Sequence, residues 1–161
     1  MRVTPSIATA NAMLNGTGLK EQLDGGFLYV FAGPVPNTAD EALDLVSAHT
    51  ALAKISLNST ATGLTLDAPA GGAIGKPGGD TWSGLVNIDG FQGAETELAP
   101  TFCRFCVGAD DGRAAADGTT GYRIQGTAGG PNSGAFLQFG VAELVDGNTQ
   151  PVGAFSLSLQ R

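Results

Sequence analysis

The spacing of apolar residues changes along this chain, and each change marks a predicted element. Near the start, apolar residues recur at helical spacing, at Ile7, Ala10 and Leu14. Thr4 and Pro5 before them suit a helix cap and a first helical position, and Asn15-Gly16 after them is a typical stop signal. The pattern predicts a short helix within an N-terminal helical segment, residues 1–20.

Residues 25–33, GGFLYVFAG, are rich in aromatic and β-branched side chains and are bounded by glycines. Both alternating faces are apolar, with Phe27, Tyr29 and Phe31 on one and Leu28 and Val30 on the other. This predicts a strand that is covered on both sides.

A second helix start follows in TADE, residues 38–41. Thr38 and Glu41 fit a capping box, in which each side chain satisfies a backbone amide of the other. The apolar residues after the box are Ala42, Leu43 and Val46. We expect a helix of one to two turns that ends near His49.

Beyond that point the apolar period is two, which is typical of half-buried strands. The predicted strands after 25–33 are 51–58, 63–68, 81–89, 102–107, 122–126, 136–144 and 155–160. Turn-rich loops, 68–80 and 108–121 among them, separate these segments, and no alternation of strand and helix is visible. Two antiparallel sheets packed face to face are therefore predicted, in a single β-sandwich domain that spans residues 1–161.

The alternation also predicts which side chains are buried. The expected core consists of Phe27, Tyr29, Phe31, Ile55, Leu57, Leu64, Leu66, Trp82, Val86, Ile88, Phe105, Ile124, Leu137, Phe139, Val141, Phe155, Leu157 and Leu159. More apolar side chains remain on the opposite phase, at Leu28, Val30, Phe102, Phe136 and Leu144. We expect these to face outward and to be covered by contact with other subunits.

Composition narrows the function classes. Only 14% of the residues are charged, against about 25% in ordinary soluble domains, and the net charge is −7. The negative charge repels phosphate backbones, so nucleic acid is not an expected partner. The chain has no apolar run that would span a membrane and no secretion signal at its start, so we expect no membrane partner and synthesis in a cytoplasm.

Cys103 and Cys106 are the only cysteines, three apart within TFCRFC. In a strand, they point to opposite faces with Cα atoms about 10 Å apart, whereas a disulfide needs less than about 7 Å. With one histidine in the chain, a zinc site lacks ligands unless carboxylates or other chains contribute. We predict two reduced, structural thiols, one packed inward with Phe105 and Val107; a disulfide to another subunit is the alternative.

No catalytic, cofactor-binding or metal-ligating residue is assigned. His49 is expected at a helix end, where the helix dipole favours positive charge. Asp110, Asp111 and Asp117 lack the spacing of a calcium loop and are interpreted as solvated turn carboxylates. Trp82 is expected in the core, with stacking on a sugar as the alternative. An enzyme would need Asp110, Asp111 or Glu95 to form paired carboxylates about 5 to 9.5 Å apart.

The order of short motifs resembles a family of small virion proteins of tailed bacteriophages. The motifs are YVFAGPVP, LAKISLN, TWSG, CRFCVGADDG, YRIQGTAG and PVGAFSLSL, spread over about residues 6 to 160. In pattern the chain is most similar to capsid cement or decoration proteins, which are β-sandwiches of jelly-roll type. The loop at 110–121 and the cysteine pair depart from that pattern, and the family has no diagnostic ligand residues to carry over.

The resemblance implies an all-β fold, an antiparallel β-sandwich of jelly-roll type with a short N-terminal helix and one further short helix. It implies a non-enzymatic cement protein that binds the outer surface of the major capsid protein lattice and stabilises the shell. Its partners would be the major capsid protein and further copies of itself, as a dimer or trimer, on the outer capsid surface of the virion. The alternative is a module of a tail or fibre that binds host glycans.

Overall fold

The computed structural model describes residues 3–116 and 121–158, and the all-β prediction is confirmed at this level. Strands make up 38% of the chain and helices 9%, with one sheet of eight strands, small sheets, two short helices and no closed barrel in the described ranges. The elements are β1 (Val3–Pro5), α1 (Ile7–Leu14), α2 (Leu19–Leu23), β2 (Phe27–Ala32), β3 (Thr50–Leu57), β4 (Ala73–Gly75), β5 (Trp82–Gly90), β6 (Glu97–Leu98), β7 (Phe102–Cys106), β8 (Arg123–Gly129), β9 (Leu137–Gln138), β10 (Leu144–Val145), β11 (Thr149–Val152) and β12 (Ser156–Ser158).

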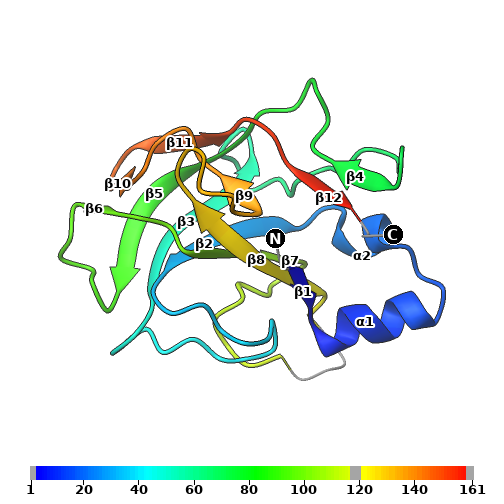
Figure 1. Ribbon diagram of the computed structural model, residues 1–161, viewed down its shortest axis with the longest axis horizontal. Coiled ribbons are helices and arrows are strands. Elements are labelled where there is room, and N and C mark those ends of the chain that lie inside the picture. Colours follow the sequence, from blue (N-terminus) through cyan, green and yellow to red (C-terminus); the bar gives the residue numbers. More distant parts are fainter. Residues whose placement is uncertain (1–2, 117–120, 159–161) are drawn as a thin grey trace.

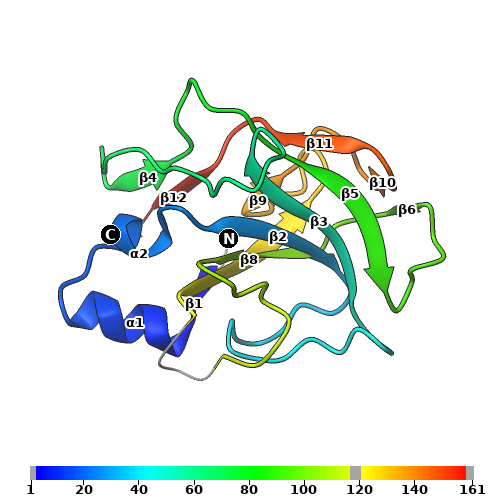
Figure 2. The same cartoon turned by 180° about the vertical axis from the view of Figure 1, so that it is seen from behind.

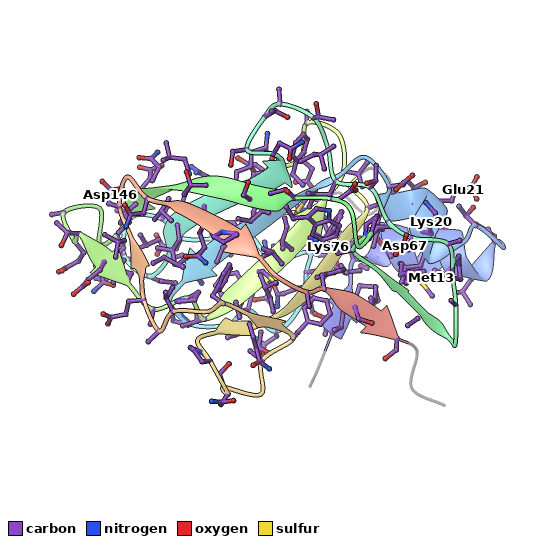
Figure 3. The ribbon with its side chains drawn as sticks, turned by 90° about the horizontal axis from the view of Figure 1, so that it is seen from above. Met13, Lys20, Glu21, Asp67, Lys76 and Asp146 are labelled. Carbon is purple, nitrogen blue, oxygen red and sulfur yellow. The ribbon has the colours of Figure 1, made fainter. Side chains whose placement is uncertain are left out.

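The main sheet has the order β1-β8-β7-β2-β3-β5-β11, antiparallel throughout, and β9 joins β8 in parallel. Two further pairs, β10 with β6 and β12 with β4, form separate two-stranded sheets. The helices lie at one end of the molecule and β6 and β10 at the other (Figures 1 and 2). Seen from above, Lys20 and Glu21 mark the helical end and Asp146 the opposite end (Figure 3).

The N-terminal helix is confirmed, but its first residues differ from the prediction. Residues Val3–Pro5 form an edge strand instead, and Ser6 is the cap, because its hydroxyl accepts a hydrogen bond from the Thr9 amide at 3.2 Å. The helix ends at Asn15, as predicted, and Gly16 takes a positive φ of 90°.

The helix predicted after residue 38 is wrong. Residues 37–49 form turns, and the second helix of the structure is α2, which begins at the end of the predicted helical segment 1–20 and extends beyond it. The Glu41 carboxylate accepts a hydrogen bond from the Asn37 amide at 3.3 Å and does not return to Thr38. Tertiary contacts, described below, hold these turns in place of an isolated helical turn, which would gain little stability alone.

Most predicted strands are present, but two are not regular strands. Residues 63–68 contribute only one bridge, between Leu64 and Gly26, and 136–144 contains two short strands that pair with different partners. The strand at 155–160 is present as β12, with its last residues outside the described part. The edge strands β1, β4, β6 and β11 were not predicted.

The phase of β2 is the opposite of the prediction. Leu28 pairs with Ile55 and Phe105 on the core face, whereas Tyr29 pairs with Lys54 and Arg104 on the other face. A change of phase by one residue exchanges all side chains of a strand between the faces, so the polar neighbours decide the phase here. We call the face that carries Tyr29 and Arg104 the outer face of the sheet.

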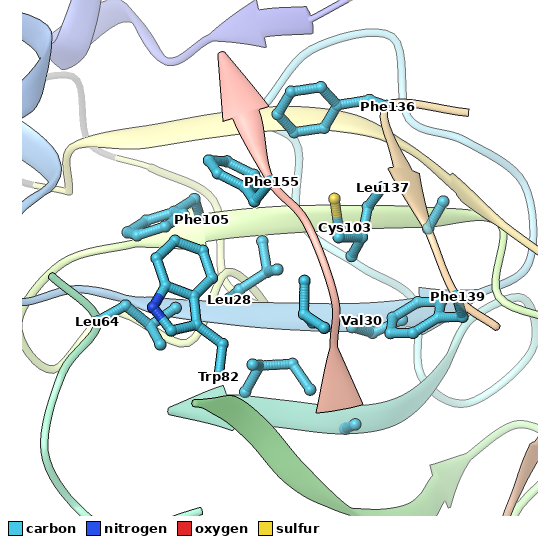
Figure 4. Close-up of a cluster of buried hydrophobic side chains, with 14 of the residues drawn as sticks. Leu28, Val30, Leu64, Trp82, Cys103, Phe105, Phe136, Leu137, Phe139 and Phe155 are labelled. Carbon is cyan, nitrogen blue, oxygen red and sulfur yellow. The ribbon is translucent and has the colours of Figure 1, made fainter. Parts of the chain in front are cut away.

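The main core lies on the other face, beneath β12 and the segments around β9 (Figure 4). The rings of Trp82, Phe105 and Phe136 surround Phe155, with centroids 5.3, 5.9 and 5.2 Å from it. The predicted core residues that are buried are Phe31, Ile55, Leu64, Leu66, Trp82, Val86, Ile88, Phe105, Ile124, Leu137, Phe139, Phe155 and Leu157.

Other burial predictions are wrong. Phe27, Tyr29 and Leu57 are only half-buried, Val141 is 43% exposed, and Leu159 lies outside the described residues. The side chains expected to face outward are all buried, namely Leu28, Val30, Phe102, Phe136 and Leu144. Covering segments supplied by the chain itself bury them, so no partner subunit is needed for these five.

Candidate binding loop on the outer face of the sheet

The most elaborate feature of the molecule is the connection from β2 to β3, residues 33–49, which we call the 33–49 loop. β2 and β3 are antiparallel neighbours, and such strands are usually joined by only about 2 to 5 residues. Loops longer than about 12 to 15 residues in a compact domain are typically either functional or disordered. Here the loop is ordered, because side chains from the sheet hold it at several points.

Arg104 on β7 holds the first half of the loop. Its side chain is fully buried and donates hydrogen bonds to the carbonyls of Glu41 at 2.8 Å, of Thr38 at 3.3 Å, and of Gly112. Its Nε donates to Oε1 of Gln125 at 2.9 Å. Burial, and then the charge of neighbouring Arg123, lowers the pKa of Arg104 to about 10, so the guanidinium stays charged at neutral pH.

Gln125 extends this contact from β8. Its Nε2 donates to the carbonyl of Pro36 at 2.8 Å, while its Oε1 accepts from Arg104. The two side chains lie opposite each other in the register of β7 and β8. Neighbouring strands thus present one continuous row of donors to the backbone of the loop.

Arg123 binds the second loop of this face, residues 107–116. It forms a bidentate ion pair with Asp110, and its Nη1 donates to the carbonyls of Ala39 at 3.2 Å and Ala114 at 2.9 Å. Burial acts to lower the pKa of Arg123, but the hydrogen bonds and charge of Asp110 outweigh it and raise this pKa. The guanidinium therefore connects both loops to β8.

The two loops also bind each other through their backbones. The Leu43 amide donates to the Arg113 carbonyl at 2.7 Å, and the Ala116 amide donates to the Asp40 carbonyl at 3.0 Å. The Asp40 carboxylate in turn accepts from the Ile7 amide at the start of α1, at 3.1 and 3.2 Å. The 33–49 loop is therefore tied to the sheet, to the 107–116 loop and to the first helix.

His49 holds the second half of the loop. Its Nδ1 accepts a hydrogen bond from the Asp44 amide at 3.1 Å, and its Nε2 lies 3.0 Å from the Pro34 carbonyl. The ring packs edge-on against Phe102, with centroids 5.8 Å apart, and Phe102 stacks on Phe31 at 5.1 Å. This small aromatic cluster is the support under the loop.

A glycine and an aspartate complete the fold of the loop. Gly33 has a φ of +116°, and a Cβ there would lie 2.4 Å from the Ala48 carbonyl oxygen, so only glycine fits. The Asp44 carboxylate accepts from the Val46 and Ser47 amides, each at 3.0 Å, and from the Ser47 hydroxyl. The side chain of Ser47, and then these amides, hold the pKa of Asp44 below 3.8.

The ordered loop presents apolar side chains to solvent. Val46, on the turn closed by Asp44, is 88% exposed, and Val35 is 47% exposed. Phe91 is 53% exposed on the next turn, whose amide at Phe91 donates to the His49 carbonyl at 3.1 Å. We call Val35, Val46 and Phe91 the loop surface.

The structure places the candidate residues from the sequence differently. His49 does not end a helix; its ring is a bonded part of the loop. Asp110 is not solvated, because Arg123 engages its carboxylate and its side chain is only 13% exposed. Asp111 is a turn carboxylate as predicted, 3.5 Å from the Arg113 guanidinium, and Asp117 lies outside the described residues.

The cysteines and the tryptophan lie where the strand interpretation predicts. Cys103 and Cys106 are free and buried within β7, and Cys103 belongs to the main core with Phe105. Desolvation raises the pKa of the Cys103 thiol to about 12 and also raises the pKa of Cys106. Trp82 is fully buried, so it has no face for a sugar to stack on.

Comparisons of this chain with protein-family models, with curated proteins and with solved structures give no match. Within residues 3–116 and 121–158, no three or more His, Cys, Asp or Glu side chains gather in a group that could hold a metal ion. None of the helices in these ranges is both long enough and apolar enough to cross a membrane.

Proposed function

We propose that this chain is a capsid cement or decoration protein of a tailed bacteriophage, without enzymatic activity. In this proposal it is made in the host cytoplasm, binds the outer surface of the major capsid protein lattice as a dimer or trimer, and stabilises the shell. The order of motifs along the sequence suggests this family. The structural observation that carries the proposal is the pre-ordered loop surface.

A loop that is ordered before it binds favours association, because a flexible loop loses conformational entropy when a partner fixes it. The 33–49 loop has already lost that freedom, because Arg104, Gln125 and His49 bind its backbone. The contact energy of Val46 is therefore available for association. A specific protein contact buries about 1,600 Å² in total, and many copies on one lattice increase a modest affinity of each.

The charges support a position on the outside of a shell. Of the eight Lys and Arg residues, Arg104 and Arg123 are buried and bonded within the protein. The surface is therefore more acidic than the net charge of −7 alone indicates. Such a surface repels packaged DNA, which favours a protein as the partner.

We also propose the finer fold, an antiparallel β-sandwich of jelly-roll type. The cover of the main core supports it, since the segment that leads into β12 crosses the face of the main sheet that carries Trp82 and Phe105 (Figure 4), and β12 pairs with β4. In this proposal the covering strands correspond to the second sheet, shortened to small pairs. An experimental structure in the bound state tests whether these pairs join into one sheet.

Particles test the function directly. We expect capsids assembled without this protein to form but to burst at lower temperature or after milder osmotic shock, and added purified protein to restore them. Val46→Glu should weaken binding to these capsids, because it places a charge in the loop surface. Leu14→Glu is the matched control, since Leu14 is 86% exposed, almost as much as Val46, but lies on α1.

Two results would contradict the proposal. If the Val46→Glu and Leu14→Glu variants bind capsids equally well, the loop surface does not take part in binding. Failure of the wild-type chain to bind expanded capsids, together with binding to cell-surface polysaccharide, would replace it with the tail or fibre alternative.

A further inference from the structure

The two ring nitrogens of His49 have opposite roles in the loop. Nδ1 is the acceptor for the Asp44 amide, so it carries no proton. The Pro34 carbonyl only accepts, so Nε2 carries the proton and donates to it at 3.0 Å. The residue is 9% exposed, and Phe102 packs against its ring. The loop as observed therefore requires the neutral imidazole in one tautomer.

We propose that His49 is a pH-sensitive latch for the turn that carries Val46. A second proton on the ring must go to Nδ1, where it meets the Asp44 amide, and two donors cannot share one hydrogen bond. The amide must then separate from the ring. The protonated Nδ1 then needs an acceptor in place of this amide. The side chain of Asp44 offers one, its carboxylate.

That carboxylate is already occupied by the turn. It accepts from the amides of Val46 and Ser47 and from the Ser47 hydroxyl. A bond from protonated His49 to Asp44 competes with these donors, so protonation opens the turn at its closing residue. The loop has two arrangements, latched with neutral His49 and open with the imidazolium.

Charged groups lie on two of the elements around the ring. Asp44 lies on the same loop, and Arg104 on β7 has its guanidinium 5.9 Å from the centre of the Phe102 ring. Asp89 on β5 is paired with Arg113 of the 107–116 loop at 3.2 Å. On β2 the stacked neighbour, Phe31, carries no charge.

This inference rests on the proposed function only for its consequence, that acidification weakens binding by moving Val46. The latch itself can be measured on the free protein. His49 is the only histidine, so the imidazole signals of a ¹⁵N-labelled sample belong to one ring. At neutral pH we expect the ¹⁵N shifts of an unprotonated Nδ1 and a protonated Nε2.

On acidification, the ring should titrate while the protein stays folded. In the same transition the amide protection factors of Asp44, Val46 and Ser47 should fall by about tenfold or more, the effect expected when single hydrogen bonds are lost. Amides of β2 should keep their protection. Ring titration without a change at these three amides would overturn the latch, as would a ring that protonates only when the protein unfolds.

His49→Asn is the matched variant, because its Oδ1 can accept from the Asp44 amide in place of Nδ1 but does not titrate. We expect this variant to lack the transition in the loop. If its Val46 and Ser47 amides lose protection over the same pH range as the wild type, His49 is not the latch. Neither measurement involves capsids. A negative result would therefore refute the latch without bearing on the proposed function.

Discussion

Replacing Arg104 with methionine tests whether the buried guanidinium holds the two loops on the outer face. Methionine retains much of the apolar stem but has no donor. Four acceptors then lose their partner: the carbonyls of Glu41, Thr38 and Gly112, and Oε1 of Gln125. Arg113→Met is the matched control, because Arg113 lies in the same region with a side chain 38% exposed and, among the described residues, forms surface ion pairs with Asp89 and Asp111.

The size of the effect follows from the fate of these acceptors. A buried acceptor without a donor costs about 1 to 3 kcal/mol. Loop carbonyls can reach water when the loops lift, whereas Gln125 is 3% exposed and stays in the sheet. Methionine also removes the cost of burying a charge, which offsets part of the loss. With the Gln125 oxygen left unsatisfied and the loop carbonyls released to water, we expect the free energy of unfolding to fall by about 1 to 3 kcal/mol.

Urea denaturation, followed by the fluorescence of the buried Trp82, measures this change. The midpoint of Arg104→Met should fall by about 1 M or more, while Arg113→Met should lose less than about 1 kcal/mol. Hydrogen exchange should show the loss of protection in the 33–49 and 107–116 loops first. Equal midpoints for the two variants would refute the argument that Arg104 is the anchor.

Three further predictions concern the core, the thiols and acid stability. Phe155→Ala should cost about 3 to 5 kcal/mol, the usual loss for a buried phenylalanine, and an unchanged melting curve would mean that β12 does not pack on the core. Cys103 and Cys106 should react with a thiol reagent only in denaturant, two per chain, because burial raises both pKa values; reaction in the native state would contradict their burial. Asp44 has a pKa below its unfolded value of 3.8, so its stabilisation is complete above that value and is lost as pH falls through the folded pKa. Asp44→Asn should accordingly reduce the dependence of stability on pH in that acid range, and an unchanged acid profile would show that the carboxylate does not close the turn.

Strands with one polar face could be predicted from the sequence because period two is a local property. Residues 81–89 were expected and β5 is Trp82–Gly90, in which buried and exposed residues alternate from Gly84 to Asp89. The phase of β2 could not be predicted from its own residues, since both of its faces are apolar. The polar partners Lys54 and Arg104 determine that phase, and they become its neighbours only when the sheet forms.

The candidate loop could not be predicted for a related reason. Arg104 and Arg123 both donate to backbone carbonyls, and Thr38 and Ala39 lie more than sixty positions before them in the chain. A carbonyl is present at every residue, so no sequence pattern marks the acceptor. The signal in the sequence is weak: Arg104 and Arg123 each lie within a predicted strand, and a charge that is buried there must be paired or hydrogen-bonded.

The order of the main sheet limits how copies of this protein can associate. Its two outermost strands along the main path are β1 and β11, and each contains a proline, Pro5 and Pro151. Proline has no N–H, so each edge lacks a donor where an incoming strand would need one. A protein displayed at high local concentration is at risk of edge-to-edge polymerisation into fibres. Here a proline obstructs that route at both ends of the main sheet, which favours contacts between copies through other surfaces.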